Sequence, residues 1–316
     1  METGQSHLQV FEMHRPHLAG LAYRMTGSLT DADDIVQDAW LRWSRIDPAA
    51  VDAPKPYLLQ IVARLCVDLT TSARARREVY VGSWLPEPVT DLPAIGGHPD
   101  AEQEASLADD LSIALLLVLE RLSPLERAAF LLHDVFDLTF KEVAGVLDRA
   151  PAACRKLASR ARRRVAEGRP EVKPSRSAAN AFIEKFQHAL TTGDVASLAK
   201  MLAEDAKLIA DGGGKVYAAL NPIEGRDRII RFLTGLVTKF GAPKEIRRLT
   251  LNGGGGLLII EGDGGLQTWS IDWNANGEAQ TIYAVRNPDK LRRLAPVAGS
   301  APQTSGIRVR ASRAPE

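Results

Sequence analysis

The stretch from residue 123 to residue 164 constrains the fold most strongly, because it combines helix starts with one tight turn. Ser123-Pro124-Leu125-Glu126 has the order of a capping box with proline at the first helical position. Leu138-Thr139 precedes a short helix, FKEVAGVL, which Asp148-Arg149-Ala150 breaks. Pro151 then opens the next helix, AACRKLASRARRRV. Two helices joined by about three residues, the second strongly basic, indicate a DNA-binding helix-turn-helix.

The helix after Pro151 carries charge of one sign. No acidic residue falls between positions 149 and 164, and the basic residues there are Arg149, Arg155, Lys156, Arg160, Arg162, Arg163 and Arg164. The inward stripe of the helix is expected to consist of Leu157, Ala158, Ala161 and Val165. The charges left outside can meet phosphates and guanine edges. A solvated helix face is the alternative, but the turn, the caps and the single sign of the charge favour DNA.

DADDIVQDAWLRW, residues 31 to 43, predicts an amphipathic helix with an acidic side. Thr30 is expected to cap it, because the aspartates of the first turn suit the positive end of the helix dipole. Apolar residues follow at spacings of three and four, namely Ile35, Val36, Ala39, Trp40 and Trp43. Pro48 is expected to end this helix, and the next is expected to begin near Pro54 or Pro56.

Composition excludes several classes of protein. The chain has 316 residues, enough for two or three domains, and a net charge of only +1. Its two cysteines, Cys66 and Cys154, form no CxxC or His/Cys cluster, so neither a disulfide framework nor a zinc site is expected. The N-terminus lacks the apolar region of a signal peptide, and the longest apolar run, residues 113 to 119, is too short to span a bilayer. We therefore expect a cytoplasmic protein without membrane contact.

The pattern along the chain changes twice. Residues 8 to 78 and 102 to 168 read as helical, and the segment between them is a Pro/Gly-rich linker in which Trp84 and Leu85 are expected to pack on something. After Ser177 the pattern is mixed, with expected helices at 178–191, 194–202 and 225–240. Strands are expected at 207–210, 215–220, 245–251, 256–260, 266–273 and 279–285. The Pro/Ser/Arg-rich tail is expected to be disordered.

Two separated segments resemble the sigma-70 family. DADDIVQDAWLRW with PYLLQIVARLCVDLTTSARARRE resembles regions 2.1 to 2.4, and LERLSPLERAAFLLHDVFDLTFKEVAGVLDRAPAACRKLASRARRRV resembles region 4. Their size and order are similar to the extracytoplasmic-function (ECF) group. The linker YVGSWLPEPV, the DGGGK at 211–215 and the NPDKL at 287–291 resemble the subgroup with a fused C-terminal SnoaL-like domain.

The resemblance implies a multidomain fold with two all-α sigma domains, a region 2 helical bundle and a region 4 helix-turn-helix, plus an α+β SnoaL-like cone-shaped barrel. The expected limits are 1–80 for region 2, 81–108 for the linker, 109–168 for region 4, 177–292 for the SnoaL-like domain and 293–316 for the tail. The implied function is that of an RNA polymerase sigma factor, which directs transcription initiation at specific promoters.

The same resemblance assigns contacts. Core RNA polymerase would be met by Asp33, Asp34, Gln37 and Asp38; a solvated helix turn is the alternative. The −10 element of promoter DNA would be met by Arg64, Arg74, Arg76 and Arg77. The −35 element would be met by Arg155, Lys156, Ser159, Arg160 and Arg163. Tyr57 stands where many relatives have Trp.

The C-terminal domain is expected to regulate rather than catalyse. Candidate carboxylates for acid-base chemistry are Asp211, Glu224, Asp263 and Asp272, and none is paired with a histidine. DGGGK lacks the spacing of a phosphate loop, and neither a cofactor nor a metal is expected. By resemblance, the sigma domains and the SnoaL-like domain make an intramolecular regulatory contact through Trp84, Leu85, Pro86, Asp211 and Lys215.

Four hypotheses remain open on the sequence. The C-terminal domain regulates the sigma domains by packing, or its pocket binds a small ligand as a sensor, or it is a tethered enzyme. A plain repressor that uses only the helix-turn-helix is the fourth. The sequence favours the first.

Overall fold

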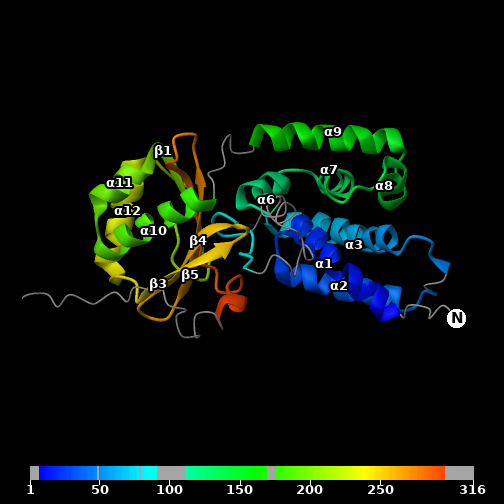
Figure 1. The fold of residues 1–316 in the computed structure, drawn as a ribbon, viewed down its shortest axis with the longest axis horizontal. Helices are drawn as coiled ribbons and strands as arrows, with labels where there is room; N and C mark the ends of the chain where they lie inside the picture. The colour runs from blue at the N-terminus through cyan, green and yellow to red at the C-terminus, as the bar shows by residue number, and fades with distance from the viewer. Residues whose placement is uncertain (1–6, 48–49, 78–79, 91–110, 169–175, 296–316) are drawn as a thin grey trace, which may run out of the picture. The chain divides into compact units, whose positions relative to one another are not determined.

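The computed structural model describes residues 7–47, 50–77, 80–90, 111–168 and 176–295 (Figure 1). Its contacts divide the chain into two compact units. The helical unit comprises residues 1–79 and 91–169, and the sheet unit combines residues 80–90 with residues 170–316. Part of the predicted linker therefore folds with the C-terminal domain.

Three helices form the first part of the helical unit: α1 (His7–Thr26), α2 (Leu29–Trp43) and α3 (Pro54–Arg77). The expected cap Thr30 is wrong, because Ser28 caps α2 by accepting a hydrogen bond of 3.1 Å from the Asp31 amide. Helix α2 also ends at Trp43, before Pro48. Its apolar face is buried as predicted, and the Trp43 indole donates a 3.0 Å hydrogen bond to the His7 carbonyl of α1.

The second part of the helical unit is the predicted helix-turn-helix. Its elements are α6 (Ile113–Glu120), α7 (Pro124–Phe130), a π-helical turn (Leu131–Val135), α8 (Phe140–Leu147) and α9 (Pro151–Gly168). The capping box predicted at Ser123 is confirmed, and Thr139 forms a second one with Glu142 at the start of α8. Asp148 closes α8 in the left-handed conformation, with φ 50°, so the chain turns directly into α9. Helix α9 packs along α7 and α8.

The sheet unit is an α+β fold. Its helices are α10 (Arg176–Thr192), α11 (Val195–Met201) and α12 (Arg226–Phe240). Its strands are β1 (Leu202–Asp211), β2 (Ile223–Glu224), β3 (Glu245–Leu251), β4 (Gly254–Ile260), β5 (Leu266–Trp273) and β6 (Ala279–Val285). The strand order is β2-β1-β6-β5-β4-β3, with β1 and β6 parallel and the other pairs antiparallel.

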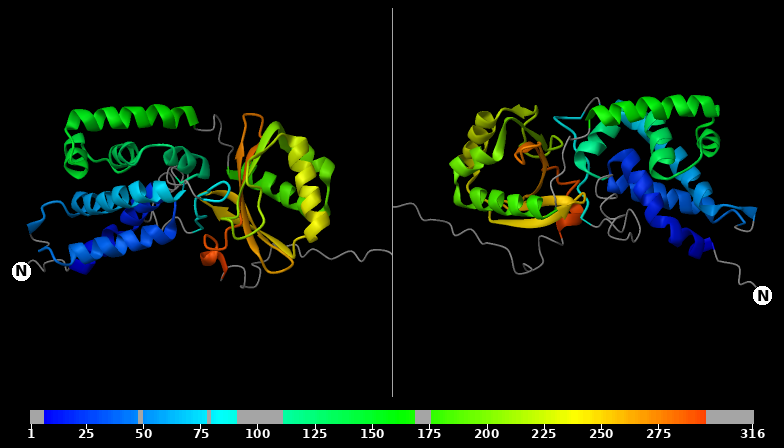
Figure 2. Two further views of the ribbon diagram at one scale, coloured as in Figure 1. Left: turned by 180° about the vertical axis from the view of Figure 1, so that it is seen from behind. Right: turned by 45° about the horizontal axis from the view of Figure 1, so that its top comes forward.

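The sheet curves around the three helices, as Figure 2 shows. Phe186 of α10 and Ile229 of α12 meet Leu257 and Ile271 of the sheet in a buried core. Successive side chains of a strand point to opposite faces of the sheet, and one face here lies against this core. The alternation of apolar and polar residues therefore predicted β5 from the sequence.

One strand prediction is wrong. Residues 215–220 lie in a loop, where Val216, Tyr217 and Leu220 are exposed. A turn at Gly212–Lys215 leads out of β1, whose two neighbours in the sheet are β2 and β6. The alternation of this segment therefore finds no strand to pair with.

The ends of the described ranges bear on two further expectations. Leu294, the last residue of a short 3₁₀ turn (Arg292–Leu294), is buried, so ordered chain continues past the predicted limit of the domain. The rest of the predicted tail, residues 296–316, lies outside the described residues, as do linker residues 91–110. Within the described ranges, no helix has both the length and the apolar content needed to cross a membrane.

Candidate functional site

Asp211, the last residue of β1, is the centre of a buried polar site. Its side chain is fully buried, and each carboxylate oxygen accepts two hydrogen bonds. Oδ1 accepts from the Tyr80 hydroxyl at 2.6 Å and from the Gly213 amide at 3.0 Å. Oδ2 accepts from the Leu85 amide at 2.9 Å and from the Lys290 ammonium at 2.6 Å. A buried carboxylate needs such compensation, because desolvation disfavours its charge.

Lys290 and Asn287 complete this site. The Lys290 ammonium also donates to the Leu85 carbonyl at 2.5 Å and lies 4.4 Å from the centroid of the Trp84 ring, a cation–π distance. The Asn287 amide donates to the Tyr80 hydroxyl at 2.9 Å. Burial, and then the hydrogen bond to the Asp211 carboxylate, raise the pKa of Tyr80 well above its usual value. We call the group formed by Tyr80, Trp84, Leu85, Asp211, Asn287 and Lys290 the linker clasp.

A second attachment fixes the end of the linker segment. The Val89 backbone N–H donates to the Asn252 side-chain oxygen at 3.1 Å, and the Asn252 backbone N–H donates to the Val89 carbonyl at 2.7 Å. Asn252 adopts φ 50°, a conformation that asparagine tolerates better than most residues. Leu85 and Val89 are both buried. The segment Tyr80–Thr90 is therefore bound along its length.

The structure brings most of the predicted regulatory residues together. Trp84, Leu85 and Asp211 belong to the linker clasp. Pro86, which follows Leu85 in the chain, is buried. Lys215 is placed differently, because it forms an ion pair with Asp289 at the surface.

Sequence reasoning missed four residues of the two attachments: Tyr80, Asn252, Asn287 and Lys290. The NPDKL motif was the available signal for Asn287 and Lys290, since it contains both. Steric crowding explains why the DGGGK motif has a glycine at position 213. Gly213 has φ +60°, and a Cβ there would lie 2.2 Å from the Asn287 amide nitrogen.

On the helix-turn-helix, Glu126 ties α7 to the basic helix. It accepts from Arg160 at 2.8 Å and from Arg164 at 3.1 Å, as well as from the amide and hydroxyl of Ser123. Burial would raise the pKa of Glu126, but the hydrogen bonds from Arg160 and Ser123 outweigh it and lower the pKa to about 2. Arg160, predicted to contact DNA, thus also has a structural partner.

The other predicted contacts on α9 are exposed. Lys156 and Ser159 face solvent, and the Arg155 guanidinium lies 5.6 Å from the centroid of the Phe140 ring. Arg163 is 72% exposed, with Glu167 at 3.8 Å. A surface pair of this kind contributes little to stability, so Arg163 can exchange its partner for a phosphate.

Arg64, predicted to contact the −10 element, has backbone partners in the helix-turn-helix. It donates to the Gly145 carbonyl at 2.7 Å and to the Val146 carbonyl at 3.0 Å, at the end of α8. Gln60 donates to the same Gly145 carbonyl at 3.3 Å. These bonds join α3 to the turn of the helix-turn-helix. The other three arginines, Arg74, Arg76 and Arg77, belong to the last turn of α3, and their side chains lie outside the described part of the structure.

The acidic side of α2 faces outward. Asp33, Asp34, Gln37 and Asp38 are exposed, whereas Ile35, Val36 and Ala39 on the other side of the helix are buried. The helix therefore presents one continuous acidic and amide surface.

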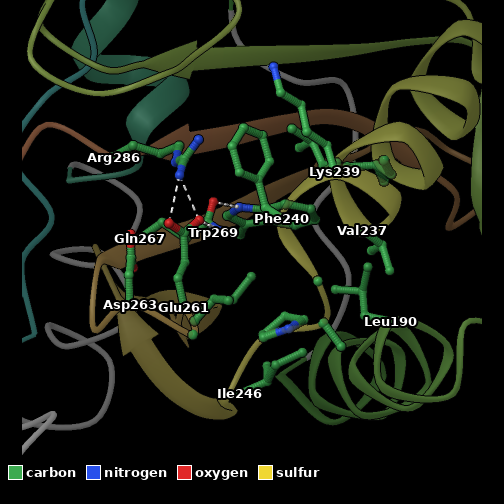
Figure 3. Close-up of a pocket in the computed structure, with 17 residues that line it drawn as sticks. Leu190, Val237, Lys239, Phe240, Ile246, Glu261, Asp263, Gln267, Trp269 and Arg286 are labelled. Atoms are coloured by element: carbon green, nitrogen blue, oxygen red, sulfur yellow. Dashed lines mark hydrogen bonds and ion pairs between the residues drawn. The ribbon is translucent and has the colours of Figure 1, made fainter. Parts of the chain in front are cut away.

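The sheet unit also contains a cavity of about 430 Å³ (Figure 3). It lies between α12 and the strands β3 to β5, and its lining includes a side-chain ion pair between Glu261 and Arg286. Its size is within the range of about 300–1,000 Å³ that is typical of small-molecule sites.

The four candidate carboxylates do not share one site. Asp211 lies in the linker clasp, Glu224 pairs with Lys207 at 3.0 Å, and Asp263 lines the cavity. Asp272 accepts from the Tyr283 hydroxyl at 2.8 Å, and burial raises its pKa to about 6.

Comparisons with known proteins agree with this architecture. The Sigma-70 region 2 family matches residues 10–77, and the Sigma-70 region 4 family matches residues 112–165. The ECF RNA polymerase sigma factor SigJ of Mycobacterium tuberculosis H37Rv is 40% identical over 303 residues, which is 89% of this chain and 92% of SigJ. The crystal structure of M. tuberculosis SigJ superimposes with a TM-score of 0.72 at 35% identity, over 90% of this chain and 98% of that chain. A probable ECF sigma factor, SigI of M. tuberculosis H37Rv, is 36% identical over 60% of this chain and 64% of its own length.

Proposed function

The chain belongs to the ECF group of sigma-70 factors, and on this premise we propose that its SnoaL-like domain controls promoter use by holding the linker between regions 2 and 4. An ECF sigma factor directs RNA polymerase to start transcription at its promoters, so the chain is an initiation factor and not an enzyme. As a partner of RNA polymerase, it is expected to act in the cytoplasm, with core polymerase and promoter DNA as its ligands.

The observation that carries the proposal is the linker clasp. A single buried carboxylate, Asp211, is bonded to Tyr80 and Leu85 of the linker and to Lys290 of its own domain. The eleven residues Tyr80–Thr90 would span at most about 40 Å if released and fully extended. Bound residues add nothing to the separation that regions 2 and 4 can reach. The clasp would therefore limit how the two sigma domains spread over a promoter.

The contact residues remain as predicted from the family, with one refinement. On α9, Lys156 and Ser159 are accessible, while Arg160 shares Glu126 with Arg164. We propose that Arg155, Lys156, Ser159 and Arg163 contact the −35 element and that Arg160 orients α9 as well as contacting DNA. The exposed acidic side of α2 is proposed as the polymerase contact, where charge sets encounter rate and register.

Arg64 is proposed to change partners. In the described structure its guanidinium is used by Gly145 and Val146 of the helix-turn-helix. Contact with the −10 element would require these bonds to break. Opening of the helical unit is thus part of the proposed activation.

Run-off transcription with core RNA polymerase tests the proposal. Asp211→Asn removes the charge that holds the linker, and Lys215→Ala, in the same motif but bonded to Asp289, is the matched control. We expect Asp211→Asn, and a chain ending after Gly168, to differ from the full chain in transcript yield at equal polymerase binding, whereas a chain ending after Arg292, which keeps Tyr80, Asp211 and Lys290, should match the full chain. Equal yields would overturn control by the clasp.

The cavity supports a second proposal, that the SnoaL-like domain binds a small ligand. The tethered-enzyme hypothesis gains less support, because the candidate carboxylates are dispersed over the domain.

A further inference from the structure

The cavity of the SnoaL-like domain has a lining that selects for one class of molecule. We propose that it takes an uncharged, mainly apolar molecule that carries at least one hydrogen-bonding group. This inference rests on the proposed ligand binding of the domain and names the class of ligand.

Most of the wall is apolar. Helix α12 contributes Leu233, Leu236, Val237 and Phe240, and other elements contribute Leu190, Ile246 and Ile259. Figure 3 shows Leu190, Val237 and Ile246 on the side of the cavity opposite Arg286 and Glu261. Phe240 is 54% exposed, so an apolar molecule seated there would remove aromatic surface from water.

The polar end is a connected set of hydrogen bonds. The Arg286 guanidinium donates to both Glu261 oxygens, at 2.6 and 2.7 Å. Gln267 donates to Glu261 at 2.9 Å and accepts from the Trp269 indole at 2.9 Å. The dashed lines in Figure 3 trace this set. Every charged member is thus already matched by an opposite charge or an amide.

This pairing argues against a charged ligand. A ligand carboxylate at the polar end would lie beside Glu261 and Asp263, and a ligand ammonium would lie beside Arg286. The lining as a whole is balanced, because the two acidic residues are offset by Arg286 and Lys239. An additional charge without a partner is unfavourable beside the Glu261–Arg286 pair, whose side chains are only 28% and 14% exposed.

A hydroxyl or carbonyl group can be accommodated without breaking the set. A glutamine amide has two N–H donors, and the contact with Glu261 uses one of them. The remaining N–H of Gln267 gives a neutral ligand a place to bind while the Glu261–Arg286 pair stays intact.

The cavity also connects directly to the linker clasp. The backbone amides of Arg286 and Asn287 both donate to the Asp211 carbonyl, at 2.7 and 2.9 Å. Asn287 in turn donates to Tyr80 of the linker. A ligand that moved Arg286 would therefore act on the residue whose carboxylate holds the linker.

Three probes with one ring system and different charges test the proposal: 2-naphthol, 2-naphthoate and 2-naphthylmethylammonium. Binding to the full chain is measured by isothermal titration calorimetry at pH 7. We expect 2-naphthol to bind at least tenfold more tightly than either ion. Equal or tighter binding of an ion would overturn the assigned class. No heat from 2-naphthol up to about 1 mM, the weak end of specific affinity, at either of two well-separated temperatures would overturn the site, because burial of apolar surface makes the binding enthalpy change with temperature.

A pair of variants on α12 locates the site. Val237→Trp places bulk in the cavity at a residue that is 49% exposed, so the fold should tolerate it. Thr234→Trp adds the same side chain at an exposed position outside the lining. We expect at least tenfold weaker 2-naphthol binding for the first variant and unchanged binding for the second. Equal effects of both variants would place the binding elsewhere and refute the proposal.

The binding experiment needs no polymerase, so it fails or succeeds separately from the control proposal. Binding of 2-naphthol together with equal transcript yields for Asp211→Asn would remove linker control and leave the ligand class standing.

Discussion

Replacing Asp211 with asparagine should destabilise the sheet unit strongly. The substitution keeps the shape of the side chain but removes the charge opposite Lys290, whose side chain is only 10% exposed. Breaking a buried ion pair by neutralising one partner typically costs about 3–5 kcal/mol, because the other charge stays buried. The new amide also presents an N–H group where Tyr80, Gly213 and Leu85 supply donors. We therefore expect the free energy of unfolding of the sheet unit to fall by about 3–5 kcal/mol.

Pulsed hydrogen–deuterium exchange at increasing urea concentration measures this loss, because it reports each unit separately in a chain that is not expected to unfold in one step. The helical unit should keep its midpoint. The double variant Asp211→Leu with Lys290→Met removes both charges and should be less destabilised than Asp211→Leu alone. A loss below about 1 kcal/mol for Asp211→Asn, the net value of one ordinary hydrogen bond, would refute the argument that this carboxylate holds the clasp together.

Three further predictions concern single side chains. Glu126 has a lowered pKa, so its bonds stabilise the fold above its unfolded pKa and are lost as pH falls from about 4.5 to about 2; Glu126→Gln should show a smaller acid loss in urea titrations, and an unchanged pH profile would contradict this. Asp272 has a pKa raised to about 6 by burial, so its protonation should stabilise the fold as pH falls from about 6 to about 4; Asp272→Asn should abolish that gain, which thermal melts at pH 7 and pH 5 would detect. Arg64→Ala removes one part-buried and one exposed bond to α8, worth about 1 kcal/mol together; amide exchange in α8 should become roughly fivefold faster, whereas equal rates would show that Arg64 does not hold the turn.

Features that depend on neighbouring residues were predictable from the sequence. The capping boxes at Ser123 and Thr139 and the break at Asp148 are local hydrogen-bond patterns, and all three are present. Strands β3 and β5 have the predicted limits, because alternation with buried partners is visible within one segment. Local information failed at residues 215–220, where the alternation exists but no strand lies beside it.

The site depended on contacts between distant residues. Asp211 stood out in its motif, but its bond to Tyr80 joins positions 131 residues apart. The charge of α9 was plain, yet the acceptor for Arg160 and Arg164 is Glu126 on another helix. The cavity has no counterpart in any single segment, since its lining comes from α10, α12 and four strands or their ends. Pairings of this kind follow from the fold and not from spacing.

The linker clasp also sets an order of events during synthesis. Tyr80 leaves the ribosome long before its partner Asn287, which is 207 residues later, and Leu85 precedes Lys290 by 205 residues. At about 5–20 residues per second this delay is roughly 10 to 40 s. Each new chain therefore has both sigma regions available, with an unclasped linker, before the domain that restrains it has emerged. A chain truncated before residue 287 would stay in that newborn state permanently.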